Sequence, residues 1–142
     1  MQVRDLMSRD VVFVSPEEPV SVAARLLSRN NVGALPVCSR DGRLRGMLTD
    51  RDIVLRCVAA QQDPNRTSVR SIMTCRVVSA DPGEDAGAAI ARMGSEQVRC
   101  LPVTEGGRVV GMLSLGDVAL RRSSPEEAAG CLEAISQNVQ KK

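Results

Sequence analysis

Hydrophobic and polar positions change their period several times along the chain, and each period predicts one element of secondary structure. A β-branched run at 11–14, ended by Ser15-Pro16, predicts a short strand followed by a turn. Apolar residues then recur at helical spacing and predict an amphipathic helix that ends near Asn30-Asn31. The residues of that apolar stripe are Val20, Ala23, Ala24 and Leu27.

A hairpin and a second helix are expected to follow. The apolar runs 35–38 and 44–49 flank an Arg-Asp-Gly sequence at 40–42, which is typical of a tight turn between antiparallel strands. The segment 50–60 predicts a second helix. Its apolar residues are Ile53, Leu55 and Val58. Strand, helix, hairpin and helix make an α+β unit, and one face of its sheet needs a cover.

The whole pattern occurs twice. At a shift of 66 residues, 3–37 matches 69–103 with 12 identities in 35 positions, and at a shift of 65, 42–56 matches 107–121 with eight identities in 15. Two long copies are too few for a solenoid, so we expect two strand-helix-strand-strand-helix repeats packed with pseudo-twofold symmetry into one module. The expected segments are a first repeat at 1–60, a linker at 61–68, a second repeat at 69–122, and a C-terminal amphipathic helix and tail at 123–142.

Composition narrows the function. The chain has 142 residues, a net charge of +2, a single Phe and no His, Trp or Tyr. Without His it lacks the usual general base and the commonest zinc ligand, and we find no nucleophile and base that would make an enzyme. Without a broad basic field or aromatic platforms, no binding of nucleic acid is expected. Any planar ligand must therefore lie against aliphatic side chains and backbone.

Cysteine use and hydropathy bear on location. Five cysteines without C-x-x-C spacing suggest no disulfide framework and no zinc knuckle, so we interpret them as reduced thiols in the cytoplasm. The N-terminus lacks the apolar stretch of a signal peptide and no 18 apolar residues run together, so no membrane association is expected. We expect Cys38 and Cys100 to be small buried hydrophobes, whereas Cys75 is the best redox candidate.

One motif carries candidate chemistry, and it lies at the same place in both copies. Thr49 and Asp52, like Ser114 and Asp117, form a Ser/Thr-x-x-Asp sequence directly after an apolar strand. This is the spacing of a capping box, in which the hydroxyl and the carboxylate satisfy backbone N–H groups at a helix start. The same helix start attracts phosphate, and the carboxylate can accept from two ribose hydroxyls. The motif thus predicts either a helix cap in an interaction or scaffold protein, or a nucleoside phosphate site.

The ordered set of motifs resembles a known family. V-x-x-h-M (h is apolar), a helix, x-x-L-P-V and G-h-h-[ST]-x-x-D follow one another twice over residues 3–122. In this the chain is similar to the tandem cystathionine-β-synthase-type (CBS, or Bateman) domain pair, and 33–37 with 46–53 resemble small stand-alone bacterial members such as the hypoxic response proteins. The resemblance implies a non-catalytic, energy-sensing regulatory module that pairs as a disc-shaped homodimer. It also implies AMP, ADP, ATP or S-adenosylmethionine as a ligand in the cleft between the repeats.

The resemblance assigns roles to residues of this chain. It implies that Thr49 and Ser114 contact phosphate and that Asp52 and Asp117 bind the ribose. Arg51 becomes a phosphate partner, with a solvated surface charge as the alternative. The other implied site residues are Ala34, Pro36, Arg99, Cys100 and Pro102 along the clefts, with Val12 and Val78 at the adenine edge.

Two departures from the family pattern matter. Leu115-Gly116 stands in the second copy where Asp50-Arg51 stands in the first, so the two sites are not equivalent. A metal-binding subset of the family uses His and Cys, and because this chain has no His we expect no metal site. Beyond the repeats, Ser124-Pro125 starts a predicted amphipathic helix that packs on its own domain, across a dimer or on an unknown protein effector.

Overall fold

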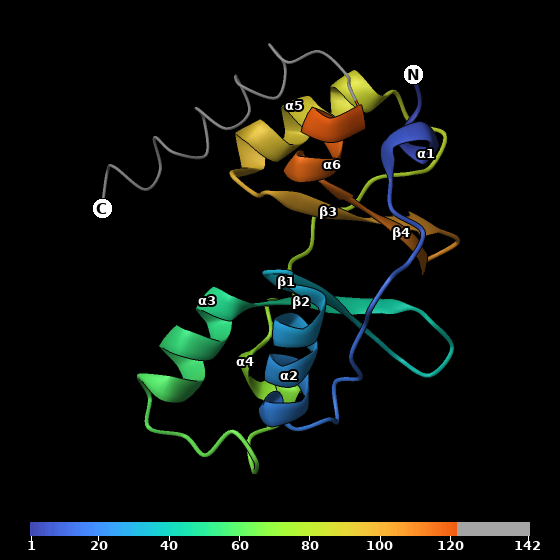
Figure 1. The fold of residues 1–142 in the computed structure, drawn as a ribbon. Coiled ribbons are helices and arrows are strands. Elements are labelled where there is room, and N and C mark those ends of the chain that lie inside the picture. Colours follow the sequence, from blue (N-terminus) through green and yellow to red (C-terminus); the bar gives the residue numbers. More distant parts are fainter. Residues whose placement is uncertain (122–142) are drawn as a thin grey trace. The chain divides into compact units, whose positions relative to one another are not determined.

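The structure is a computed structural model, and it describes residues 1–121 of the chain (Figure 1). The chain forms two compact units of mixed helix and strand, which confirms the α+β class. The first-copy unit consists of residues 12–77 and 107–109; the second-copy unit consists of residues 1–11, 78–106 and 110–121. Each unit thus contains the first residues of the other sequence copy: 69–77 lie in the first-copy unit and 1–11 in the second-copy unit, and we call them the exchanged segments.

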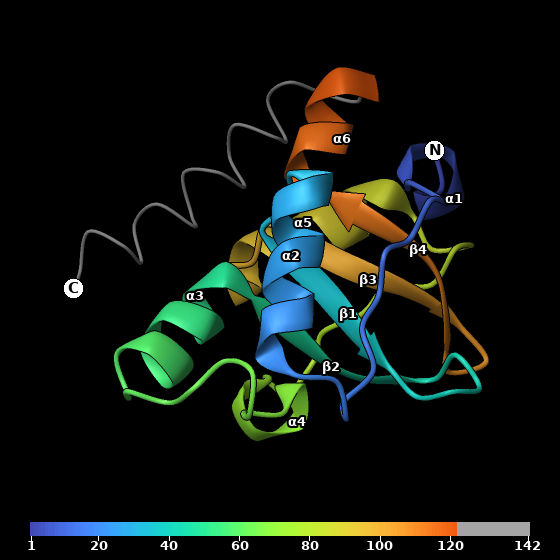
Figure 2. The same cartoon turned by 60° about the horizontal axis from the view of Figure 1, so that its bottom comes forward.

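The first-copy unit holds a helix, a hairpin and several short helical turns. Its elements are α2 (Val20–Asn30), β1 (Ala34–Cys38), β2 (Leu44–Thr49), α3 (Asp50–Ile53), the π-helix η1 (Val54–Val58) and α4 (Val69–Ile72). The predicted helix and hairpin are confirmed: α2 ends where Asn31 takes a left-handed φ of 52°, and β1 pairs antiparallel with β2. Figure 2 shows α2 running along the β1–β2 hairpin.

The second-copy unit repeats this arrangement. Its elements are α1 (Val3–Leu6), α5 (Ala86–Glu96), β3 (Cys100–Glu105), β4 (Arg108–Ser114) and α6 (Leu115–Arg121). β3 and β4 form a two-stranded sheet, and α5 ends at Gln97 with a left-handed φ of 58°. The two copies therefore share their hairpins and the way their long helices end.

The long helices depend on distant backbone carbonyls at their N-termini. Pro19, the N-cap of α2, makes no side-chain cap, and the Val20 N–H donates instead to the Thr67 carbonyl at 2.8 Å. At the start of α5, the Ala86 N–H donates to the Met1 carbonyl at 2.9 Å. Because the first N–H groups of a helix have no partner within it, these bonds satisfy donors that would otherwise be unpaired.

The exchanged segments complete the sheets of both units. In the first-copy unit, Met47 of β2 and Thr74 form a bridge with two N–H to carbonyl bonds of 2.9 Å. In the second-copy unit, Met112 of β4 and Ser8 do the same, at 2.8 and 2.9 Å. On the opposite edge of each hairpin, Val14 and Ala80 add parallel bridges to β1 and β3, respectively. A single sequence copy thus lacks one edge of its own sheet.

Two glycines permit the close approach of the exchanged segments. A Cβ placed on Gly46 would lie 2.7 Å from the Thr74 carbonyl oxygen, and one placed on Gly111 would lie 2.9 Å from the Ser8 carbonyl oxygen. Heavy atoms this close overlap, and a backbone carbonyl cannot turn away as a side chain does. Close packing of the exchanged backbone therefore explains why the Gly-Met-Leu sequence of both copies begins with glycine.

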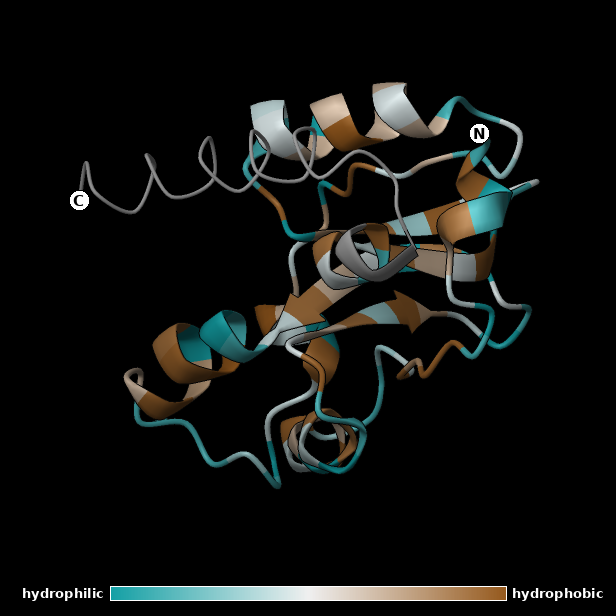
Figure 3. Cartoon of the chain, turned by 45° about the horizontal axis from the view of Figure 1, so that its top comes forward, coloured by the Kyte–Doolittle hydropathy of each residue, from teal (hydrophilic) through white to brown (hydrophobic). Residues whose placement is uncertain are grey.

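Each unit has its own aliphatic core, and the exchanged helices contribute to it. Val69 and Ile72 of α4 are buried in the core of the first-copy unit, and Val3 and Leu6 of α1 in that of the second. The other buried residues of the first core are Val14, Val20, Ala23, Leu27, Leu35, Val37, Leu48 and Cys57. Those of the second are Met7, Ala80, Ala86, Ala89, Ile90, Met93, Leu101, Val103, Leu113 and Val118. Figure 3 shows apolar colour on the strands and on the helices that cover them.

Two expectations about local structure need correction. The run 11–14 contributes one bridging residue, Val14, instead of a longer strand, and Phe13 is exposed. The predicted helix at 50–60 changes from α to π at Val54, and its apolar residues Leu55 and Val58 face solvent. The wider turn of a π-helix shifts the buried stripe, so that Cys57 enters the core in their place.

The predicted amphipathic helix at 123–142 lies outside the described residues. Among the helices of residues 1–121, none has both the length and the apolar character needed to cross a bilayer.

The glycine contacts predict the effect of adding a methyl group. We expect Gly46→Ala and Gly111→Ala each to lower the free energy of unfolding by about 1–3 kcal/mol, because a Cβ overlaps the exchanged backbone. Urea unfolding followed by circular dichroism measures the change. Gly116→Ala is the control: its Cβ would meet nothing closer than 3.9 Å, so its midpoint should not fall. An unchanged midpoint in both β-strand variants would contradict the prediction.

Candidate functional site

The Ser/Thr-x-x-Asp motif of the first copy forms a complete capping box between β2 and α3. The Asp52 N–H donates to Thr49 Oγ1 at 3.1 Å, and the Thr49 N–H donates to Asp52 Oδ2 at 3.0 Å. In the second copy the Asp117 N–H donates to Ser114 Oγ at 3.1 Å. The helix-cap interpretation of both motifs is therefore confirmed, and the question is whether these atoms also bind a ligand.

A backbone bond ties each turn to the start of the preceding hairpin. The Asp50 N–H donates to the Gly33 carbonyl at 3.0 Å, and the Leu115 N–H donates to the Arg99 carbonyl at 2.9 Å. In the first-copy unit, the antiparallel register also places Ala34 opposite Thr49. The structure thus brings Ala34, Thr49 and Asp52 together in one unit, and Arg99 and the Ser114 turn together in the other.

Asp52 is buried, at 8% exposure, and among residues 1–118 it is the single charged residue that is buried. Its Oδ1 faces two groups: the hydroxyl of Thr74 at 3.4 Å and the guanidinium of Arg56 at 3.8 Å. An ionised carboxylate has about four lone-pair sites. With Oδ2 taken by the Thr49 N–H and Oδ1 held by long contacts, acceptor capacity remains on Oδ1.

Asp117 has a different neighbour. Burial raises the pKa of the Cys100 thiol to about 11, and the nearby charge of Asp117 adds to the rise. The thiol is therefore neutral at physiological pH and does not compete with Asp117 as an anion. The two copies present the same carboxylate in different surroundings, as the unequal sequences of their turns imply.

The remaining predicted site residues lie at several depths. Pro36 and Pro102 are buried within β1 and β3, and their carbonyls accept from the Val14 and Ala80 N–H groups at 3.2 and 3.0 Å. Half-buried positions are held by Ala34, Cys100, Val12 and Val78. Arg51 and Arg99 are exposed, and the described residues provide no ion pair for either guanidinium.

Sequence analysis missed two residues that contact Asp52. Thr74 reaches it from the exchanged segment, which no local pattern predicts. Arg56 also donates to the carbonyl of Ile72 at 3.0 Å, so it links α4 to the turn. A signal for Arg56 was present, because it lies four residues after Asp52 on a predicted helix and is identical to Arg121 in the second copy.

The cysteines partly follow expectation. Cys38 is buried, and burial raises the pKa of its thiol. Cys100 is only partly buried, and Cys75 is exposed, as expected. Over the described part of the chain, Cys, Asp and Glu side chains form no group of three that would hold a metal ion.

The capping box predicts a loss of stability when its hydroxyl is removed. Thr49→Ala should lower the free energy of unfolding by about 0.5–2 kcal/mol, because the Asp52 N–H loses its acceptor. The matched variant Thr49→Ser keeps the hydroxyl and should keep most of the stability. Urea unfolding of both variants makes the comparison, and equal midpoints for Ala and Ser would contradict the cap.

The raised thiol pKa values predict slow alkylation. At about pH 8, iodoacetamide should modify exposed Cys75 well before Cys38 or Cys100, because only the thiolate reacts. The rate at Cys100 should rise as the pH approaches about 11. Because the folded-state pKa lies above the unfolded value, Cys100 favours folding most below pH 9.0, and this contribution disappears as the pH rises towards 11. Mass spectrometry of peptides gives each rate, and early labelling of Cys100 would count against its burial.

Comparisons with known proteins identify the family of this chain. The family model for the CBS domain matches residues 3–58 and 69–123. The CBS domain-containing protein YhcV of Bacillus subtilis is 41% identical over 138 residues, covering 96% of this chain and 97% of the relative. Hypoxic response protein 1 of Mycobacterium tuberculosis is 37% identical over 125 residues, covering 88% of this chain and 86% of the relative.

Solved structures extend the agreement to the fold. The crystal structure of Hypoxic Response Protein I with two coordinated zinc ions has a TM-score of 0.80 and 34% identity, and the match covers 87% of this chain and all of that one. The CBS domain pair of protein MJ0100, in complex with 5'-methylthioadenosine and S-adenosyl-L-methionine, has a TM-score of 0.75 and 26% identity over 84% of this chain and 94% of that one. With both repeats matched, this chain belongs to the CBS domain family and is a tandem CBS pair.

Proposed function

We propose that this chain is a non-catalytic regulatory module that binds an adenosyl ligand at its Ser/Thr-x-x-Asp turns. The observation that carries the proposal is the position of Asp52: a buried carboxylate at a helix start, with acceptor capacity left on Oδ1. Two hydroxyls of a ribose need such an acceptor. The MJ0100 pair, a structural neighbour, is known with two adenosyl compounds bound, which supports the same ligand class here.

Each residue of the turn has a role in this proposal. Thr49 and Ser114 donate their hydroxyl protons to phosphate while their oxygens continue to cap the helix, since a hydroxyl is donor and acceptor at once. Asp52 and Asp117 accept from ribose. Arg51, exposed beside the first turn, pairs with phosphate. The second turn has Leu115-Gly116 in place of Asp50-Arg51 and so lacks both a cation and an anion, and the two turns should differ in their affinity for phosphorylated ligands.

The base would be held without stacking. The chain has one Phe and no Tyr or Trp, and the residues that we assign to the base are small or aliphatic: Ala34, Pro36, Val12 and their counterparts Cys100, Pro102 and Val78. Backbone N–H and carbonyl groups then supply the polar contacts to adenine. In this proposal the module acts as a homodimer, and its output depends on a separate protein effector that distinguishes the bound from the free conformation.

Ligand-dependent stability tests the proposal. The thermal midpoint of the protein is measured with AMP, ADP, ATP, S-adenosylmethionine and 5'-methylthioadenosine. A ligand that binds only the folded state adds about 2.7 kcal/mol at 100 times its Kd. We expect at least one compound to raise the midpoint, and Asp52→Asn or Asp117→Asn to remove the rise, because each loses a charged acceptor.

Asp85→Asn is the matched control. Asp85 caps α5 by accepting from the Ala88 N–H at 3.1 Å, so this substitution alters a helix cap outside the proposed site. It should leave the ligand-induced rise intact. If no compound raised the midpoint, or if Asp85→Asn lost the rise equally, both motifs would act only as helix caps. That result would favour the alternative of an interaction or scaffold protein.

A further inference from the structure

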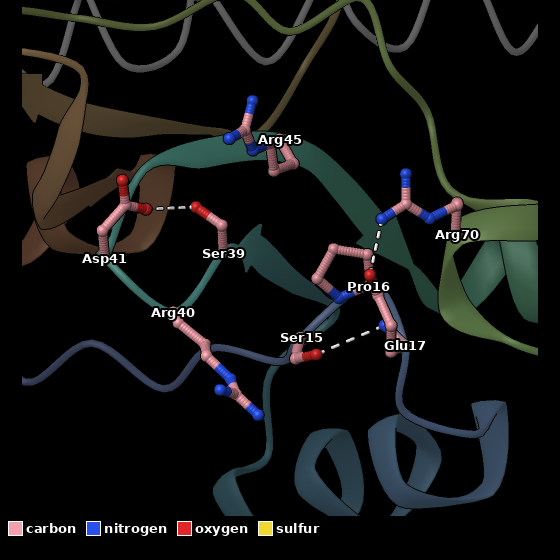
Figure 4. Close-up of a pocket in the computed structure, with 8 residues that line it drawn as sticks. All are labelled: Ser15, Pro16, Glu17, Ser39, Arg40, Asp41, Arg45 and Arg70. Atoms are coloured by element: carbon pink, nitrogen blue, oxygen red, sulfur yellow. Dashed lines mark hydrogen bonds and ion pairs between the residues drawn. The ribbon is translucent and has the colours of Figure 1, made fainter.

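A hollow lined mainly by charged and hydroxyl-bearing residues lies in the first-copy unit, at the opposite end of the hairpin from the Thr49 turn. Its volume is about 800 Å³, and its walls come from the segment 15–17, the hairpin loop at 39–41, and two arginines, Arg45 and Arg70 (Figure 4). Arg45 precedes Thr49 by four residues on β2, which is about 13 Å along a strand. The hollow and the turn are therefore separate places on the same strand.

The acidic residues of the hollow are already engaged. Glu17 pairs with the guanidinium of Arg70 at 2.6 Å. Asp41 accepts from the Ser39 hydroxyl and lies 3.3 Å from Nε of Arg43. The Ser39 hydrogen bond, with help from Arg43, holds the pKa of Asp41 below its usual value, so this carboxylate is ionised and satisfied near neutral pH.

Two arginines at the hollow lack a counterion. Among residues 1–118, no acidic side chain forms an ion pair with Arg40 or Arg45, and both arginines are exposed. In Figure 4 their guanidinium groups stand apart from one another and from Arg70. Long side chains of this kind can turn towards a bound anion and form bidentate hydrogen bonds to it.

The hairpin adds further positive charge at a cost to stability. Arg43 lies directly opposite Arg108 in an antiparallel bridge, closed by a 3.0 Å bond from the Leu44 N–H to the Gly107 carbonyl. Like charges directly opposite each other destabilise a strand pair. Arg43 pairs with Asp41, a residue that lines the hollow, so its charge lies next to those of Arg40, Arg45 and Arg70.

We propose that this hollow binds a small anion with several phosphoryl groups, independently of the Ser/Thr-x-x-Asp turns. Guanidinium groups match phosphoryl oxygens in geometry and charge. The hydroxyl oxygen of Ser15 accepts from the Glu17 N–H at 3.2 Å, so its proton is available to the anion. A nucleic acid fits less well, because the net charge is only +2 and the hollow has no aromatic wall on which a base would stack.

Inorganic tripolyphosphate is the probe, and isothermal titration calorimetry of the full chain is the measurement. We expect binding that weakens as the salt concentration rises. The double variant Arg40→Gln and Arg45→Gln should weaken the affinity about tenfold or more, because charge-assisted hydrogen bonds to the anion are lost. Both side chains are exposed, so the variant should keep the circular dichroism spectrum of the native protein.

Arg25→Gln together with Arg29→Gln is the matched control. These exposed arginines lie on α2 in the same unit, and the double substitution changes the net charge by the same amount outside the hollow. The inference would be overturned if tripolyphosphate did not bind, or if the control lost as much affinity as the Arg40 and Arg45 variant. It would also be overturned if a single-stranded oligonucleotide bound more tightly through the same arginines. Asp52→Asn should leave tripolyphosphate binding unchanged, so failure of the adenosyl site and failure of this site are distinguishable.

Discussion

The passage of an exchanged backbone over a glycine is the contact on which both units depend. At Gly46 and Gly111 a strand of one copy meets the first residues of the other copy, at a distance that excludes a Cβ. The same segments carry α1 and α4, whose apolar residues lie in the two cores. The short helices α1 and α4 would be marginal alone, so tertiary packing of their apolar faces is what stabilises them. Each core is thus built from two separate stretches of the chain.

This exchange connects the candidate ligand site with the rest of its unit. Thr74, which follows α4, contacts the buried carboxylate of Asp52, and Arg56 links the same carboxylate to the carbonyls at the end of α4. A ligand that took acceptor capacity from Asp52 would compete with these contacts. A change at the turn would therefore reach the first residues of the second copy, which gives a regulatory module a physical route from binding to conformation. Such a route acts only if the ligand binds two conformations with different affinity.

Charge is distributed unevenly although its sum is small. A net charge of +2 gave no reason to expect an anion site, because the total averages over a basic hairpin and acidic segments elsewhere. The folded hairpin brings Arg43 opposite Arg108, two residues far apart in the sequence. The local field, which determines what a surface attracts, depends on this arrangement.

The sequence by itself determined the repeat, the fold class, the long helix that ends near Asn30-Asn31, the hairpin and the two capping motifs. These features depend on local periodicity, on turn residues and on side chains within four positions of one another. Tertiary structure alone decided which segment completes which sheet, that Thr74 reaches Asp52, and that the helix after Thr49 becomes a π-helix with Leu55 and Val58 exposed. These outcomes depend on contacts between residues distant in the chain, and a pattern of neighbouring residues has no information about which distant backbone will pack against them.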